Sequence, residues 1–82
     1  MGNKVAVMSI IVVNNESVEK LNGLLHEYRE WIIGRMGIPY REKKMNIISI
    51  AMDAPLERIS ALVGAIGSLP GISVISANIS ND

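Results

Sequence analysis

Residues 4–13 read KVAVMSIIVV, and this stretch decides the fold. It is rich in β-branched residues, and its apolar side chains occupy both odd and even positions. Because successive side chains of a strand point to opposite faces, the pattern predicts a strand that is covered on both faces. Such a strand belongs at the centre of a sheet, so the rest of the chain must supply the elements that surround it.

The next segment predicts a helix and then a second strand. Apolar residues recur at helical spacing over residues 17–30, and the Ser17 hydroxyl can accept an unpaired N–H at the start of that helix. The segment from Trp31 to Met36 predicts the strand. We expect it to end at Pro39, because proline has no N–H to donate to a ladder.

The second half of the chain repeats this order. A polar connection at residues 40–44 (YREKK) leads into residues 45–52 (MNIISIAM), which predict a third strand. Residues 53–55 (DAP) open a second helix, because proline suits a first turn, and the Pro-Gly pair at 70–71 ends it. The stretch Ile72–Ile79 predicts the last strand.

The predicted order is strand, helix, strand, strand, helix, strand, in one α+β domain over residues 1–82. With right-handed crossovers and short connections, it predicts a ferredoxin-like βαββαβ sandwich. Its antiparallel sheet has the order 4-1-3-2, with two helices on one face. The first and third strands therefore lie at the centre, and they are also the two most continuously apolar segments.

The composition excludes several classes of protein. Lys and Arg together number 8, as do Asp and Glu, so the chain lacks the basic excess of a strong nucleic-acid binder. There is no cysteine, which excludes a disulfide scaffold, a thiolate metal site and a cysteine nucleophile. The N-terminal apolar run has no signal-peptide cleavage site, and Pro70 and Gly71 interrupt the uncharged stretch from Ile59 to Asn81. We expect a cytoplasmic protein without a membrane span.

The sheet has few charged residues for a protein that works as a single chain. A sandwich of this type leaves the face away from the helices in water, where charged and apolar residues should alternate. The first strand carries a charge only at Lys4, and the third strand, from Met45 to Met52, carries none. We therefore expect a homo-oligomer, a dimer or a tetramer, that covers this face. A small neutral surface is the alternative.

Arg35 is the most informative candidate for a binding site. It lies between Gly34 and Gly37 in an otherwise apolar strand, where its guanidinium should pair with a carboxylate, an anionic ligand or a neighbouring subunit. An ordinary arginine of an edge strand is the alternative. The turn before the first helix is a second candidate, because anions bind at helix N-termini. We expect any ligand to lie between subunits, and the candidate residues are Asn14, Asn15, Arg35, Gly37, Tyr40 and Arg41.

The sequence offers no catalytic or metal-binding constellation. His26 is the only histidine, and helical spacing places it on the solvated side of the first helix. Without cysteine, one imidazole cannot hold a transition metal unless symmetry mates contribute ligands. The serines lack a partner base for nucleophilic catalysis. We therefore expect no enzyme and no metal or cofactor. Glu42 interrupts the basic cluster around the second strand, so we expect no direct nucleic-acid binding either.

Three stretches carry a resemblance to a known family, and the likeness covers nearly the whole chain. They are LHEY at 25–28, IIGRMGIPYRE at 32–42 and GAIGSLPGISV at 64–74, and the segment GRMGIPYRE is the most specific. They are similar to the family of iron-only hydrogenase system regulators. The resemblance implies a small stand-alone ferredoxin-like domain, related in shape to ACT domains and to the C-terminal domain of the nickel-responsive repressor.

The resemblance also implies a regulatory role linked to hydrogenase maturation. Nickel sensing does not carry over, because that repressor uses several histidines and a cysteine for its metal. Many ACT domains bind amino acids near a glycine in the first strand-to-helix turn. That turn, at residues 14–17, has no glycine here, so amino-acid binding of this type does not carry over either. The implied function is a non-enzymatic, oligomeric module that binds a small ligand or a hydrogenase-maturation protein. A purely structural protein–protein module without a small ligand is the alternative.

Overall fold

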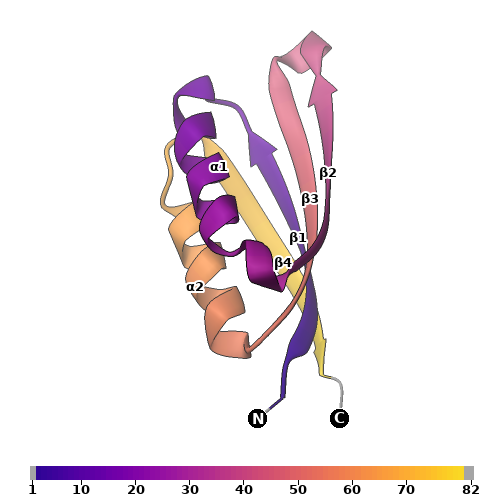
Figure 1. The fold of residues 1–82 in the computed structure, drawn as a ribbon. Helices are drawn as coiled ribbons and strands as arrows, with labels where there is room; N and C mark the ends of the chain where they lie inside the picture. The colour runs from indigo at the N-terminus through magenta and orange to yellow at the C-terminus, as the bar shows by residue number, and fades with distance from the viewer. Residues whose placement is uncertain (1, 81–82) are drawn as a thin grey trace.

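The computed structural model describes residues 2–80, and it confirms the predicted βαββαβ fold. The four strands form one antiparallel sheet in the order β2-β3-β1-β4, and both helices cover the same face of it (Figure 1). The elements are β1 (Lys4–Val12), α1 (Val18–Glu27), β2 (Ile32–Tyr40), β3 (Met45–Ala54), α2 (Leu56–Gly67) and β4 (Ile72–Ser80). Short 3₁₀ turns occur at Asn15–Ser17, Arg29–Trp31 and Arg41–Lys43.

β1 is the central strand that its sequence predicts. All of its residues from Lys4 to Val12 pair with β3 on one edge and with β4 on the other. Every second side chain from Ala6 to Val12 is buried beneath the helices, whereas the side chains between them face away. Because both edges of β1 are used, its position and register are fixed by two neighbours at once.

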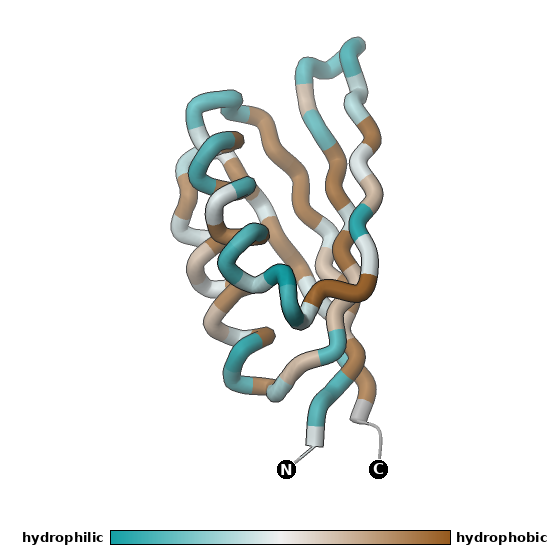
Figure 2. The backbone as a smooth tube through the Cα atoms, in the orientation of Figure 1, coloured by the Kyte–Doolittle hydropathy of each residue, from teal (hydrophilic) through white to brown (hydrophobic). Residues whose placement is uncertain are grey.

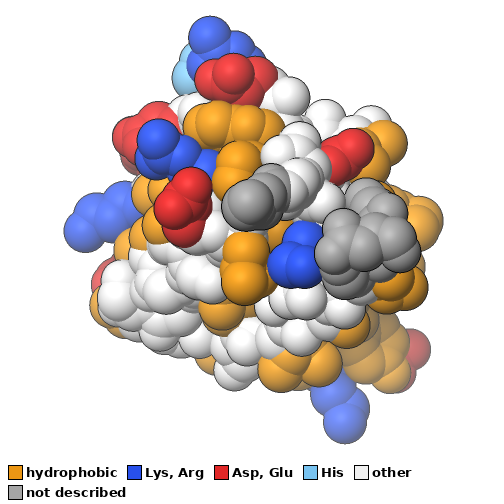
Figure 3. All heavy atoms as spheres, turned by 90° about the horizontal axis from the view of Figure 1, so that it is seen from below, with side chains coloured by type: hydrophobic (Ala, Val, Ile, Leu, Met, Phe, Trp, Pro, Cys, Tyr) orange, Lys and Arg blue, Asp and Glu red, His pale blue; other side chains and the backbone are white. Residues whose placement is uncertain are grey.

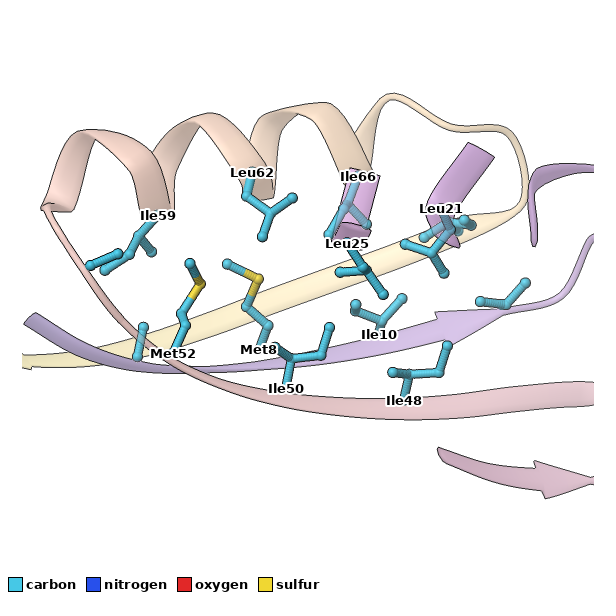
Figure 4. Close-up of a cluster of buried hydrophobic side chains, with 14 residues drawn as sticks. Met8, Ile10, Leu21, Leu25, Ile48, Ile50, Met52, Ile59, Leu62 and Ile66 are labelled. Carbon is cyan, nitrogen blue, oxygen red and sulfur yellow. The ribbon is translucent and has the colours of Figure 1, made fainter. Parts of the chain in front are cut away.

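The core lies between the helices and one face of the sheet. Large aliphatic side chains from α1, α2, β1 and β3 meet there (Figure 4), and hydrophobic positions recur along both helices and the central strands (Figure 2). The largest fully buried side chains are Met8, Ile10, Val12, Leu21, Ile50, Met52, Ile59, Leu62 and Ile66. Within residues 2–80, neither helix is long and apolar enough to cross a bilayer.

The edge strand β2 is longer than its sequence predicts. It passes through Pro39 and ends at Tyr40, so the prediction that Pro39 ends the strand is wrong. Only one side of an edge strand has a partner, which is why a residue without an N–H is tolerated there. The second helix also begins later than predicted, at Leu56, because Asp53 and Ala54 continue β3 and Pro55 takes the N-cap position.

The loop after β1 is joined tightly to the loop before β4. The Val13 N–H donates to the Gly71 carbonyl at 2.8 Å, and the Ser17 hydroxyl donates to the Pro70 carbonyl at 2.6 Å. The prediction that the Ser17 hydroxyl caps the first helix is therefore wrong. A buried hydroxyl needs a partner, and this one finds it 53 residues away rather than in its own helix.

We expect Gly71→Ala to weaken this junction. Gly71 has a φ of +71°, which L side chains rarely adopt, and a Cβ there would overlap the side chain of Asn14. The substitution should lower the free energy of unfolding in urea by about 1–3 kcal/mol. Gly23→Ala is the control, because it adds a methyl group to exposed space on α1 and should raise that free energy by about 0.5–1 kcal/mol. Equal stability of Gly71→Ala and the wild type would contradict the described junction.

Candidate functional site

The β2–β3 hairpin extends past the helices at one end of the molecule, which measures 42 × 19 × 18 Å (Figure 1). Between α1 and this hairpin lies a cavity of about 340 Å³. Its walls are mainly aliphatic, with three polar side chains among them. The lining residues are Val12, Val18, Leu21, Asn22, Arg35, Gly37, Ile38, Pro39, Asn46, Ile47 and Ile48.

Two further hollows adjoin this cavity. One of about 330 Å³ shares Asn22 and Arg35 with it, and another of about 320 Å³ shares Pro39 and Asn46. We call the three hollows together the α1–β2 groove, since each of the outer two shares lining residues with the central cavity. Its remaining lining residues are Leu25, His26, Arg29 and Ile32 at one end, and Asn15, Tyr40, Arg41, Lys44 and Met45 at the other.

Arg35 joins the two sides of this groove. Its Nη2 donates to Oδ1 of Asn22 on α1 at 3.0 Å. Arg35 pairs with Ile50, which is buried beneath the helices, so its side chain leaves β2 on the helix face of the sheet. Among the described residues, the side chain that accepts from this guanidinium is a neutral amide and not a carboxylate. An amide satisfies one of the five N–H donors of a guanidinium and does not neutralise its charge.

The charges along the groove have one sign. Four of the eight Lys and Arg residues line it, namely Arg29, Arg35, Arg41 and Lys44. None of the described residues that line it is an aspartate or a glutamate, although the chain has as many acidic as basic residues. The groove is therefore a positive region on a protein of zero formal charge, and its chemistry suits an anionic occupant.

The structure brings together five of the six residues that the sequence singled out. Arg35 and Gly37 line the central cavity, and Asn15, Tyr40 and Arg41 line the hollow beside the hairpin tip. The sixth, Asn14, instead accepts the Glu16 N–H on its side chain at 2.8 Å and packs against Gly71. A ligand role for these residues stays a prediction.

Sequence reasoning missed the residues that face Arg35 from other elements. Asn22 lies on α1 and Asn46 on β3, and nothing in their local patterns marks them as part of a site. Arg29 and His26 read as ordinary solvated residues at the end of a helix, and both are exposed. Among the described residues, no group of three or more His, Cys, Asp or Glu side chains could hold a metal ion.

The opposite face of the sheet, which we call the open face, is apolar. Large side chains there are well exposed, including Ile75 at 73%, Ile79 at 70% and Met36 at 61%. Figure 3 shows hydrophobic side chains gathered along the flank on the sheet side of the molecule. The register places one charged residue, Asp53 at the margin, among the described side chains of this face. Its other exposed hydrophobic residues are Val7, Ile11, Ile38 and Tyr40.

Comparison with known proteins supports the resemblance that the sequence suggested. A family model described as "TM1266-like: Iron-only hydrogenase system regulator, putative" matches residues 4–76. The solved structure of the uncharacterized protein TM1266 from Thermotoga maritima is similar, with a TM-score of 0.91 and 29% sequence identity. That match covers 95% of this chain and 99% of the other.

A formyltetrahydrofolate deformylase from Pseudomonas putida KT2440 shares the fold alone. Its TM-score is 0.64 at 10% sequence identity, and the match covers 89% of this chain but 28% of the deformylase. No curated protein matches the chain.

We expect Arg35 to contribute little to the stability of the fold. Its hydrogen bond to Asn22 is exposed, so Arg35→Gln should change the free energy of unfolding in urea by about 0.5 kcal/mol or less. Leu21→Ala, in the same groove but fully buried, should lower it by about 2–5 kcal/mol. A large loss for Arg35→Gln would show that this arginine serves the fold rather than a site.

Proposed function

Because the chain belongs to the family of iron-only hydrogenase system regulators, we propose that it is a non-enzymatic regulatory module that works as a homo-oligomer. In this proposal the oligomer, a dimer or a tetramer, binds a small ligand or a protein partner of that system in the cytoplasm. The family description supports the regulatory role. The open face is the observation that carries the proposal, because it marks a surface that a single chain leaves uncovered.

The exposed area of the protomer supports self-association. Its accessible surface is 5433 Å², several hundred Å² above the ~4,800 Å² that size scaling gives for a monomer of 8.9 kDa. The largest apolar patch on a monomer is usually about 300–600 Å².

The dimensions of the open face match a dimer interface. Four strands about 4.8 Å apart and nine or ten residues long, at about 3.3 Å per residue, span about 19 Å by 30 Å, a flat area of about 570 Å². A standard interface covers about 800 Å² on each partner, and the protruding side chains bring the accessible area of this face closer to that value. Two such faces can pack about 10 Å apart around a two-fold axis, since each surface then meets its own copy.

The relief at the centre of the open face supports a second copy as its occupant. Ser9 and Ser49 pair there, with Met36 and Ile75 at the two ends of the same row. A hollow of about 160 Å³ lies beside Ser9 and is lined by Val7, Ile75, Ser76 and Ala77. Small residues between large ones allow two faces to interdigitate, which is how stacked sheets pack.

Ile75→Glu tests the interface. We expect the wild type to sediment as a dimer or a tetramer, and the variant to sediment as a monomer at the same concentration, because an unpaired carboxylate would be buried in each copy. Leu56→Glu is the matched control, since Leu56 is an exposed hydrophobic residue of α2, away from the open face, and should leave the oligomer intact. Circular dichroism confirms that both variants are folded. A wild type that sediments as a monomer at high micromolar concentration would contradict the proposal.

The regulatory role is tested in the host cell. Deletion of the gene should change the hydrogenase activity per cell, and the wild-type gene should restore it, as should Leu56→Glu. Ile75→Glu should fail to restore it, because the proposed module acts as an oligomer. Unchanged hydrogenase activity after deletion would contradict the proposed regulatory role. It would not affect the conclusion that sedimentation gives about the oligomer.

A further inference from the structure

We propose that the α1–β2 groove binds an extended acidic segment of a partner protein, with apolar residues between its carboxylates. This inference deepens the proposed function and rests on it for the role of partner binding. It names the surface and the chemistry of the partner, and its central residue, Arg35, lies on the face of the sheet opposite to the open face.

The length of the groove favours an extended chain. Its basic residues start at Arg29, just before β2, and reach Arg41 and Lys44, just after it. The nine residues of β2 between them span about 30 Å at about 3.3 Å per residue. An extended peptide of about nine residues covers the same distance. A small acid in the central cavity would contact Arg35 and would leave the cations at both ends without a partner.

The charge along the groove indicates acidic residues in the occupant. Arg29 is held at one end, where its Nη1 donates to the His26 carbonyl at 2.9 Å. Arg35 stands in the middle with guanidinium donors beyond the one that Asn22 accepts. Arg41 and Lys44 flank the turn at the other end. Carboxylates spaced along a peptide could meet these cations in turn, and no described carboxylate of the lining competes for them.

The middle of the groove indicates apolar residues between those carboxylates. Val18, which is half-buried, and Pro39, which is exposed, line the cavity with Arg35 and offer hydrophobic contact to a side chain of the occupant. Asn22 and Asn46 supply amide groups that can both donate to and accept from a peptide backbone. All three hollows open to solvent, whereas sites for small molecules usually enclose most of the ligand surface. An open groove with these walls suits a chain that enters at one end and leaves at the other.

Self-association through the open face leaves Arg35, at the centre of this groove, accessible, although Ile38 and Tyr40 of the open face border the groove near the hairpin tip. Arg35 faces the helix side of the sheet, and its neighbour Met36 faces the open side, because adjacent residues of a strand point in opposite directions. Variants of groove cations therefore leave the open face unchanged, so peptide binding and self-association can be measured separately on the same protein.

The experiment uses the full chain and a fluorescent peptide of about nine residues, with glutamates at both ends and leucines in the middle. We expect fluorescence anisotropy to show binding at low ionic strength that weakens as salt is added, because exposed ion pairs are screened. A matched peptide with glutamine in place of glutamate should bind roughly tenfold more weakly or not at all. Equal binding of the two peptides would overturn the proposal.

Paired variants locate the binding. The double variant Arg35→Gln with Lys44→Gln removes two groove cations, and it should raise the Kd for the acidic peptide roughly tenfold. The double variant Lys20→Gln with Lys43→Gln removes the same charge from exposed residues that do not line the groove, and it should change the Kd by less than about twofold. Equal weakening by both pairs would indicate binding by overall charge and would overturn the assignment to the groove.

The last experiment tests whether the groove binds a small carboxylate instead of a peptide. Benzoate titrated against the labelled protein should leave the NMR amide signals of the groove nearly unmoved, whereas the acidic peptide should shift them. Shifts with benzoate and none with the peptide would overturn the proposal in favour of a small-acid site. Sedimentation of the same samples separates the peptide-binding hypothesis from the oligomer hypothesis. A protein that sediments as an oligomer but does not bind the peptide would contradict only the inference about the groove. A protein that binds the peptide but sediments as a monomer would contradict only the proposed oligomer.

Discussion

β1 is apolar on both faces, and the rest of the structure depends on how those two faces are covered. On one side, Met8 and Ile10 are wholly buried under α1 and α2. On the other side, Val7 and Ile11 remain 47% and 40% exposed, because none of the described helices packs there. In the single chain, therefore, only the side chains of β1 under the helices contribute the full hydrophobic free energy of burial to stability. The proposed self-association follows from this asymmetry between the two faces of one strand.

Much of the fold could be predicted because its signals are local. The apolar run of β1, the helical spacing within α1 and α2, and the Pro-Gly pair before β4 each act on their own segment. The sheet order then follows from general rules on connections. The predictions that failed depend on contacts that a local pattern does not contain. Pro39 is tolerated because β2 has a neighbour on one side only, and Ser17 is used by a carbonyl 53 residues away.

The candidate site could be predicted in part for the same reason. Arg35 and Gly37 stand out in their own strand, because a charge and two glycines interrupt an apolar segment. Asn22 and Asn46 do not stand out, because each becomes part of the groove only when α1 and β3 are placed beside β2. The single sign of the groove charge is only in part a tertiary property, since Arg35, Arg41 and Lys44 already cluster in the sequence, whereas Arg29 joins them only in the fold. A balance of charge over the whole chain therefore concealed an imbalance on one surface.

The open face and the α1–β2 groove differ in physical character, and this difference suits them to two different proposed interactions. The open face offers non-directional apolar contact, whose strength depends little on salt, so it suits a lasting association. The groove offers exposed charges, whose contacts are individually weak and salt-dependent, so it suits a reversible partner. A two-fold pair formed through the open faces would present two grooves on its outer sides. A partner with two acidic segments on a linker of matching span would then bind both, and the second contact would benefit from a high effective concentration. In this arrangement the oligomer would strengthen the binding of a partner that each groove alone binds weakly. The uncovered face of β1 would then serve partner binding as well as the stability of the protein.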